Sequence, residues 1–246
     1  MIFDDDFSKI CDEEKPFVQP WHGDSPHDDK MSYLDMASDV ELLIKDVQKI
    51  EDRDRPINLL GHSMGGRTAM VTALNYPELI NKLIVVDVSP DNGRTSEISG
   101  TISKYIMNMN QVNFNGLETK YRKASDARNH VATQLSKVVD DKGVLAFLMM
   151  NMVQDRQTKK HSWRSNIPAI CSEISEISNF PYVKGQNFKN HTLFIGGRNS
   201  NYISLRHYGL INELFPNNEI EMVENAGHWV HADQPNEFVK LVTEFL

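Results

Sequence analysis

A serine placed between glycines is the residue with the clearest chemical potential in this chain. The segment Gly61-His62-Ser63-Met64-Gly65 has the spacing G-x-S-x-G, and it stands between a short apolar run at 57–60 and a helical pattern at 64–74. In that strand–turn–helix setting the motif is a nucleophile elbow, whose tight turn exposes the serine oxygen at a sheet edge. The sequence therefore predicts that Ser63 is a nucleophile that forms an acyl-serine intermediate.

The neighbours of Ser63 have expected roles of their own. We expect side chains at Gly61 and Gly65 to collide with the adjacent strand and helix, so that the turn requires glycine at both positions. The backbone N–H of Met64 stands at the positive end of the predicted helix and can donate a hydrogen bond to a developing oxyanion. The sequence thus predicts Met64 as one donor of an oxyanion hole.

A histidine late in the chain is the candidate base. His228 lies in the segment Asn225-Ala226-Gly227-His228-Trp229, which follows the last predicted strand. In this type of site the chain order is serine, acid, histidine, and the position of His228 agrees with that order. His231 is the weaker candidate because it lies closer to the terminal helix. The alternative for His228 is simple packing under Trp229.

The acid has an unusual expected position. No Asp or Glu occurs between residues 177 and 212, although the acid commonly follows a strand such as the one predicted at 191–195. Asp87 ends the apolar run at 83–88 and would reach the same carboxyl edge of the sheet, where it could orient His228. Ser200 occupies the vacated position and could add a hydrogen bond. The alternatives are a loop cap for Asp87 and an ordinary turn residue for Ser200.

Alternating patterns predict the elements that must position these side chains. Strands alternate with helices, which favours an α/β fold with a mostly parallel sheet. A largely helical insertion, a cap of about 91–188, separates two strands. The expected elements are helices at 32–51 (with Ser32 and Asp35 as its capping signal), 64–74, 204–214 and from Pro235 onward, and strands at 57–60, 83–88, 191–195 and 219–223, with Gly196-Gly197 as a turn.

Composition excludes several classes of protein. The 246 residues carry a net charge of −8, which would repel nucleic acid. The cysteines, Cys11 and Cys171, form no CxxC pair and the nine histidines show no ligand spacing, so no metal is expected. Hydrolysis needs only water, and no cofactor is expected. The longest apolar run, at 144–153, is too short to span a bilayer, so no transmembrane segment is expected.

Residues 1–30 differ from the remainder of the chain in their charge. Residues 1–30 hold nine acidic and three basic side chains, and the segment reads as neither a secretory signal nor a transit peptide. We expect 1–21 to be an irregular acidic segment and 22–246 to be the hydrolytic domain.

Several further motifs carry a family resemblance. The chain resembles the α/β-hydrolase superfamily, specifically the group of abhydrolase domain-containing protein 11 with its bacterial esterase relatives, from residue 22 to 246. The motifs that carry the resemblance are His22-Gly23-Asp24-Ser25-Pro26-His27, the elbow at 61–70, Val86-Asp87-Val88-Ser89-Pro90, Trp163-Arg164-Ser165-Asn166, Gly197-Arg198-Asn199-Ser200 and 226–232.

The resemblance implies an α/β-hydrolase fold and a serine esterase or lipase that acts on acylglycerols or other lipid-like esters. It implies a mitochondrial location, for which this chain supplies no transit peptide; a cytoplasmic location is the other expectation. Thioesterase or amidase activity stays open, since these residues do not choose the leaving group. No protein partner is indicated.

The short stretch before His22 departs from the family pattern. The resemblance implies several strands before the loop at His22 and a second oxyanion donor in an early loop, but four strands would need more than the 21 residues that precede His22. The early strands and the second oxyanion donor are therefore expected to be missing, and the strand at 57–60 would then present a bare apolar edge. The alternative function is therefore a catalytically impaired binding protein of the α/β-hydrolase fold.

Overall fold

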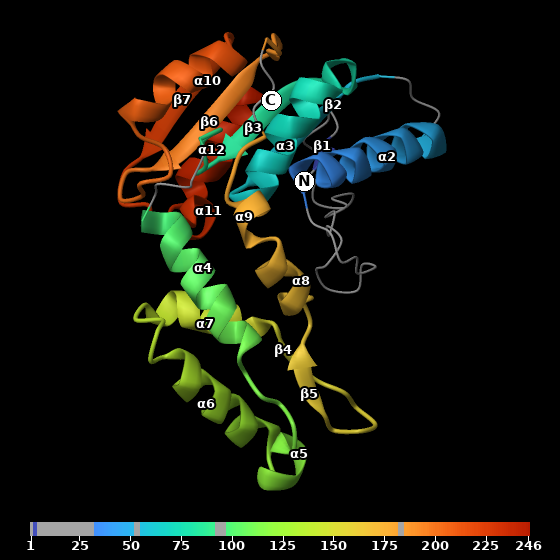
Figure 1. Ribbon diagram of the computed structural model, residues 1–246. Coiled ribbons are helices and arrows are strands. Elements are labelled where there is room, and N and C mark those ends of the chain that lie inside the picture. The colour runs from blue at the N-terminus through green and yellow to red at the C-terminus, as the bar shows by residue number, and fades with distance from the viewer. Residues whose placement is uncertain (1, 4–31, 52–54, 92–96, 182–184) are drawn as a thin grey trace. The chain divides into compact units, whose positions relative to one another are not determined.

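The computed structural model describes residues 2–3, 32–51, 55–91, 97–181 and 185–246 (Figure 1). Its described residues form two compact units. Unit 1 comprises the strand at 2–3 together with 32–91 and 179–246, and unit 2 comprises 97–178. The predicted boundaries at residues 21, 91 and 188 stay predictions.

A five-stranded sheet is the centre of unit 1. Its order is β1-β2-β3-β6-β7, and the last four strands are parallel. The alternation of strands with helices confirms the predicted α/β class, and Figure 1 shows these strands side by side. The strands are β1 (Ile2–Phe3), β2 (Ile57–His62), β3 (Ile80–Val86), β6 (Thr192–Gly197) and β7 (Asn218–Val223).

The edge beside β2 differs from the expectation. β1 pairs antiparallel with β2, with Ile2 opposite Leu59 and Phe3 opposite Asn58. The expectation that the first residues hold no strand and leave this edge bare is therefore wrong at this place. Two residues form a ladder too short to show any periodicity in a sequence. The remainder of the acidic segment and the His22 loop lie outside the described residues.

Helices cover both faces of the sheet. On one face α12 (Pro235–Phe245) packs over a cluster of strand residues through Phe238, Leu241, Val242 and Phe245. Side chains alternate along a strand, so the neighbouring strand residues point to the opposite face, where α3 (Met64–Asn75) contacts β2 and β3. The cluster under α12 contains Leu60, Ile84, Val86, Leu193, Ile195 and Val223.

The predicted helix at 32–51 is confirmed as α2 (Tyr33–Glu51). Its start is capped as expected: the Ser32 hydroxyl donates to Asp35 Oδ2 at 2.7 Å and accepts from the Asp35 N–H at 3.1 Å. Leu34 is 50% exposed, and the buried face is formed by Tyr33, Met36, Ala37, Val40 and Ile44. That face packs on α3.

Several predicted bounds need correction. β3 begins three residues before the expected strand and ends at Val86, so that Asp87 and Val88 follow it. Gly196 and Gly197, expected to form a turn, belong to β6 because they pair with Met222 and Val223 of β7. The expected helix at 204–214 is divided into η4 (Leu205–His207) and α10 (Tyr208–Leu214); unit 1 also contains η2 (Pro77–Leu79) and α11 (Val230–Asp233).

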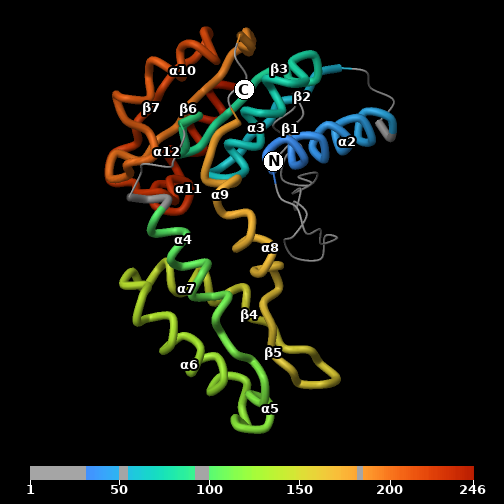
Figure 2. The backbone as a smooth tube through the Cα atoms, viewed as in Figure 1, coloured from blue at the N-terminus to red at the C-terminus, as the bar shows by residue number. Residues whose placement is uncertain are grey.

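Unit 2 is mostly helical, as expected, but also holds a hairpin that the sequence did not predict. Its strands are only three residues long, below the length at which alternation is visible. Figure 2 follows the chain through α4 (Glu97–Asn110), α5 (Leu117–Lys120), α6 (Ala124–Leu135), α7 (Lys142–Met150), the hairpin β4 (Met152–Gln154) and β5 (His161–Trp163), α8 (Ile167–Ser172) and α9 (Ile174–Ile177).

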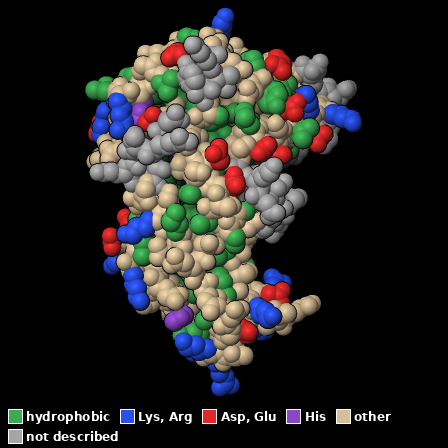
Figure 3. Space-filling view, viewed as in Figure 1, with side chains coloured by type: hydrophobic (Ala, Val, Ile, Leu, Met, Phe, Trp, Pro, Cys, Tyr) green, Lys and Arg blue, Asp and Glu red, His purple; other side chains and the backbone are tan. Residues whose placement is uncertain are grey.

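The methionines of unit 2 divide between its core and its surface. Met109, Met149 and Met152 are buried, whereas Met107 and Met150 are exposed. Figure 3 shows hydrophobic side chains among the polar ones on the visible face of unit 2. Within the described part of the chain, no helix is long and apolar enough to cross a membrane.

Candidate active site

Ser63 occupies a strained turn between β2 and α3. Its φ of 54° lies in the left-handed region, which a non-glycine residue adopts only when the surrounding structure enforces it. Two backbone hydrogen bonds supply that constraint: the Ser63 N–H donates to the Val86 carbonyl at 3.0 Å, and the Arg67 N–H donates to the Ser63 carbonyl at 3.1 Å. The turn therefore ties the serine to β3 and to the first turn of α3.

The glycines around Ser63 are not equivalent. A Cβ at Gly61 would lie 2.2 Å from the Gly65 carbonyl oxygen, and a Cβ at Gly66 would lie 2.7 Å from Val88 Cγ1. At Gly65 no described atom beyond its chain neighbours and the backbone of its own helix lies within 4 Å of an added Cβ. The predicted collision at Gly65 is therefore wrong, because it is the Gly65 backbone, rather than a missing side chain, that approaches Gly61.

The structure brings Ser63, His228 and Asp87 together. Ser63 Oγ lies 2.9 Å from His228 Nε2, and His228 Nδ1 lies 2.7 Å from Asp87 Oδ2. With Nδ1 protonated, the imidazole donates to the carboxylate and leaves Nε2 to accept the serine proton. All three residues follow the carboxyl ends of parallel strands, which explains how positions so far apart in sequence meet.

Asp87 is fully buried, and its carboxylate has further donors. The Ser200 hydroxyl donates to Oδ2 at 2.5 Å, and the Gly197 N–H donates to Oδ1 at 3.0 Å. Ser200 therefore stands where the sequence predicted it, beside the carboxylate. Burying an unpaired carboxylate is costly, and these donors together with His228 offset that cost.

A close backbone approach beside Asp87 was not predicted. A Cβ at Gly197 would lie 2.1 Å from the Gly227 carbonyl oxygen and 2.6 Å from that of Ala226. Glycine at 197 therefore lets the loop that carries His228 pass directly over the end of β6. The pattern Gly196-Gly197 was the available signal, but a turn was the simpler interpretation.

His62 is a second feature that sequence reasoning missed. Its Nε2 lies 2.8 Å from the His228 carbonyl oxygen, and its ring is 4.7 Å from the His228 ring and 5.1 Å from that of His231. A carbonyl only accepts, so His62 Nε2 is the donor. Burial lowers the pKa of His62 to about 4, which keeps the ring neutral. His62 thus anchors the backbone at His228.

The structure also places Met64 and His231, the other two predicted candidates. Met64 is the first residue of α3, and the N–H groups of a first helical turn have no acceptor within the helix. His231 lies in α11 with its ring near His62 and Phe238. Burial lowers the pKa of His231. Among the described residues, its side chain makes no hydrogen bond to Ser63 or Asp87, so His228 is the histidine that reaches both.

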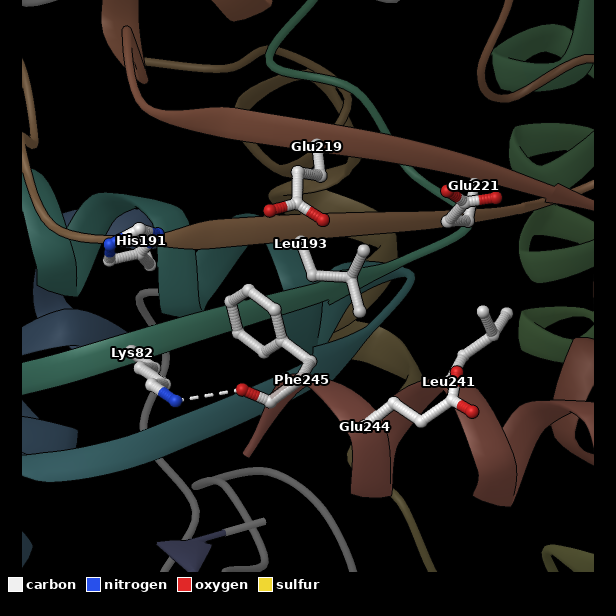
Figure 4. Close-up of a pocket in the computed structure, with 8 residues that line it drawn as sticks. All are labelled: Lys82, His191, Leu193, Glu219, Glu221, Leu241, Glu244 and Phe245. Carbon is white, nitrogen blue, oxygen red and sulfur yellow. Dashed lines mark hydrogen bonds between the residues drawn. The ribbon is translucent and has the colours of Figure 1, made fainter.

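A separate pocket lies at the opposite end of the strands (Figure 4). It has a volume of about 320 Å³ and lies beside α12, near the amino ends of β3, β6 and β7. Lys82 Nζ donates there to the carbonyl oxygens of Phe245 at 2.8 Å and Leu246 at 3.1 Å, which secures the end of α12. The lining residues are Lys82, His191, Leu193, Glu219, Glu221, Leu241, Glu244 and Phe245.

The parts of the chain that the structure describes contain no group of three or more His, Cys, Asp or Glu residues that could hold a metal ion. Cys171, in α8, is a free cysteine, and Cys11 lies outside the described residues.

Gly61 and Gly65, on either side of Ser63, should differ in their tolerance of a side chain. Gly61→Ala should lower the free energy of unfolding by about 2 kcal/mol or more, because the new methyl group meets backbone that cannot move aside. Gly65→Ala should change it by less than about 1 kcal/mol, since the site is open and alanine favours the helix. Urea denaturation of both variants measures the difference, and equal losses would contradict this account of the turn.

The stability of the protein in acid should depend on His62. A pKa of about 4 in the folded protein, below the ordinary 6.5, means that the unfolded chain binds the proton first as pH falls. The contribution of His62 to the free energy of unfolding is fully present above pH ~6.5. It declines as pH falls toward ~4, by about 2 kcal/mol between pH 7 and pH 5.

The control for this prediction is His62→Asn, which cannot titrate. Urea denaturation at the two pH values should show a smaller acid loss in the variant, by the same amount of about 2 kcal/mol. Identical losses in the two proteins would contradict a neutral, buried His62.

Comparisons with known proteins identify the family of this chain. The family model of the alpha/beta hydrolase fold matches residues 19–235. The mouse "sn-1-specific diacylglycerol lipase ABHD11" is 38% identical over 225 residues, which cover 92% of this chain and 68% of that protein. A "putative esterase/lipase" of Haemophilus influenzae is 32% identical over 92% of this chain and 70% of its own length.

The fold of a solved structure also matches this chain. The chain of a "marine microorganism esterase" has a TM-score of 0.81 and 33% sequence identity, and the match covers 93% of this chain and 82% of that one. The family match thus spans both compact units and includes Ser63, Asp87 and His228. This chain belongs to the α/β-hydrolase family.

Proposed function

We propose that this chain is a serine hydrolase that cleaves carboxylic esters, with Ser63 as nucleophile, His228 as general base and acid, and Asp87 as the residue that orients His228. The observation that carries the proposal is the continuous set of contacts from Ser63 Oγ to His228 Nε2, at 2.9 Å, and from His228 Nδ1 to Asp87 Oδ2, at 2.7 Å. The lipase and esterase names of the matched relatives support the same reaction class and disfavour the binding-protein alternative.

In the first half of the reaction, Ser63 Oγ attacks the ester carbonyl carbon while its proton passes to His228 Nε2. The carbonyl oxygen becomes an oxyanion, and the Met64 N–H at the start of α3 donates to it. The tetrahedral intermediate then expels the alcohol, which takes the proton from His228. The product at this stage is an acyl group esterified to Ser63.

In the second half, water replaces the alcohol. His228 Nε2 takes a proton from the water, whose oxygen attacks the acyl carbon, and the acid leaves as Ser63 regains its proton. Asp87 accepts the Nδ1–H throughout and stabilises the imidazolium that forms in both halves. The expectation that the second oxyanion donor is missing concerns the residues before His22, which apart from 2–3 lie outside the described residues, and it stays a prediction.

The relatives support the proposed substrate class. A diacylglycerol lipase and esterases match this chain over both compact units, which favours an acylglycerol or another lipid-like ester as substrate. The mitochondrial location implied by the resemblance is likewise a proposal. It is tested by microscopy of the tagged full-length protein in cells of its source organism.

Covalent labelling tests the proposed nucleophile. A fluorophosphonate probe should label the protein at Ser63, and Ser63→Ala should abolish the label while leaving the melting temperature within a few degrees of the unsubstituted protein. Folded protein that takes no Ser63-dependent label would overturn the esterase proposal in favour of the binding-protein alternative.

Two aspartates provide a matched test of the acid. Asp87→Asn should lower kcat by about 10³–10⁴-fold, because an amide cannot hold the Nδ1–H tautomer of His228. Asp91→Asn should stay within a few-fold, since Asp91 contacts His207, at 3.4 Å, and not His228. Hydrolysis of p-nitrophenyl butyrate measures both variants, and equal effects would remove Asp87 from the proposed role.

A further inference from the structure

The ring of Tyr202 lies flat against the imidazole of His228. The two ring centroids are 4.1 Å apart and the planes are inclined by only 21°, which is a stacked arrangement. We propose that Tyr202 is a positioning residue of this site, whose ring holds the His228 imidazole in the one plane that joins Asp87 to Ser63. This inference rests on the proposed function and extends it to a residue that neither the elbow motif nor the candidate acid indicated.

The backbone around Tyr202 is anchored on both sides. Its N–H donates to Ser200 Oγ at 3.3 Å, and the same hydroxyl donates to Asp87 Oδ2. After it, Ile203 is 2% exposed, and the Ser204 N–H donates to His207 Nδ1 at 3.0 Å. The loop that follows β6 therefore contacts the site twice, through a hydroxyl on the carboxylate and through an aromatic face on the imidazole.

The geometry of His228 explains why its ring needs a neighbouring side chain that prevents rotation. Nδ1 and Nε2 must point at Asp87 and Ser63 at the same time, so rotation of the imidazole about its bond to Cβ breaks both hydrogen bonds together. The carboxylate fixes only one edge of the ring. A flat neighbour at stacking distance blocks the rotation, and small misplacements of a reacting group cost up to about 100-fold in rate.

The charge that develops on His228 also suits an aromatic neighbour. Proton transfer from Ser63 makes the ring an imidazolium, which the electron-rich face of a tyrosine attracts. Burial raises the pKa of Tyr202 to about 12, so the phenol stays neutral. Among the described residues, the Tyr202 hydroxyl makes no hydrogen bond, which assigns the role to the ring rather than to the hydroxyl.

The test separates the ring from the hydroxyl. Tyr202→Leu should lower kcat for p-nitrophenyl butyrate by about 10-fold to 100-fold with KM changed by less than about 2-fold, because the imidazole loses its alignment and not its substrate. Tyr202→Phe, which restores the ring, should recover most of the lost kcat. Tyr208→Leu removes a half-buried ring from the same region without a ring contact to His228, and it should leave kcat unchanged.

The outcomes are distinguishable. Suppose that the unsubstituted protein shows Ser63-dependent labelling. If Tyr202→Leu then keeps its kcat, with KM either unchanged or raised, the role of Tyr202 is overturned while the proposed function stands. The same holds if Tyr202→Phe is as impaired as Tyr202→Leu. If Tyr202→Leu does not fold, Tyr202→Met fills the space with a flexible side chain and takes its place. Absence of any Ser63-dependent activity would overturn the proposed function and this inference together.

Discussion

The buried carboxylate of Asp87 is the point on which the site depends. It follows β3 with a φ of 45°, and its oxygens accept from His228, which follows β7, and from Ser200 and Gly197 at the end of β6. Charge-assisted hydrogen bonds of this kind are stronger than neutral ones. One side chain therefore joins the loops of three strands and fixes the histidine that reaches Ser63.

The sheet supplies the remainder of the arrangement. Parallel strands place Ser63, Asp87, Ser200 and His228 at one edge, and the Lys82 pocket lies at the opposite end. Close backbone approaches then bring the loops within hydrogen-bonding distance: Gly61 lets the elbow close on Gly65, and Gly197 lets the loop of His228 cross β6. A Cβ at either glycine would collide with backbone, so substitution of either one would separate the parts of the site.

Much of the site could be predicted from the sequence, because its signals are local. Ser63 sits in a short motif, His228 follows in the expected order, and Asp87 was found by the lack of another acid near residue 195. His62 and Tyr202 were missed, since their roles arise from approach to a loop more than twenty residues away. Gly65 was misjudged for a similar reason: a motif gives the spacing of glycines but not which of them faces backbone. The strand at 2–3 and the hairpin of unit 2 are too short to leave a pattern.

The hydrogen bond between His228 Nδ1 and Asp87 Oδ2 can be observed directly by proton NMR of the whole protein. We expect a downfield, exchange-protected imidazole N–H signal that is present in the unsubstituted protein and in Asp91→Asn and absent from both Asp87→Asn and His228→Ala. A signal that persists in folded Asp87→Asn with unchanged shift would contradict it, because the proton would then be held by another acceptor and Asp87 would not be the residue that orients His228.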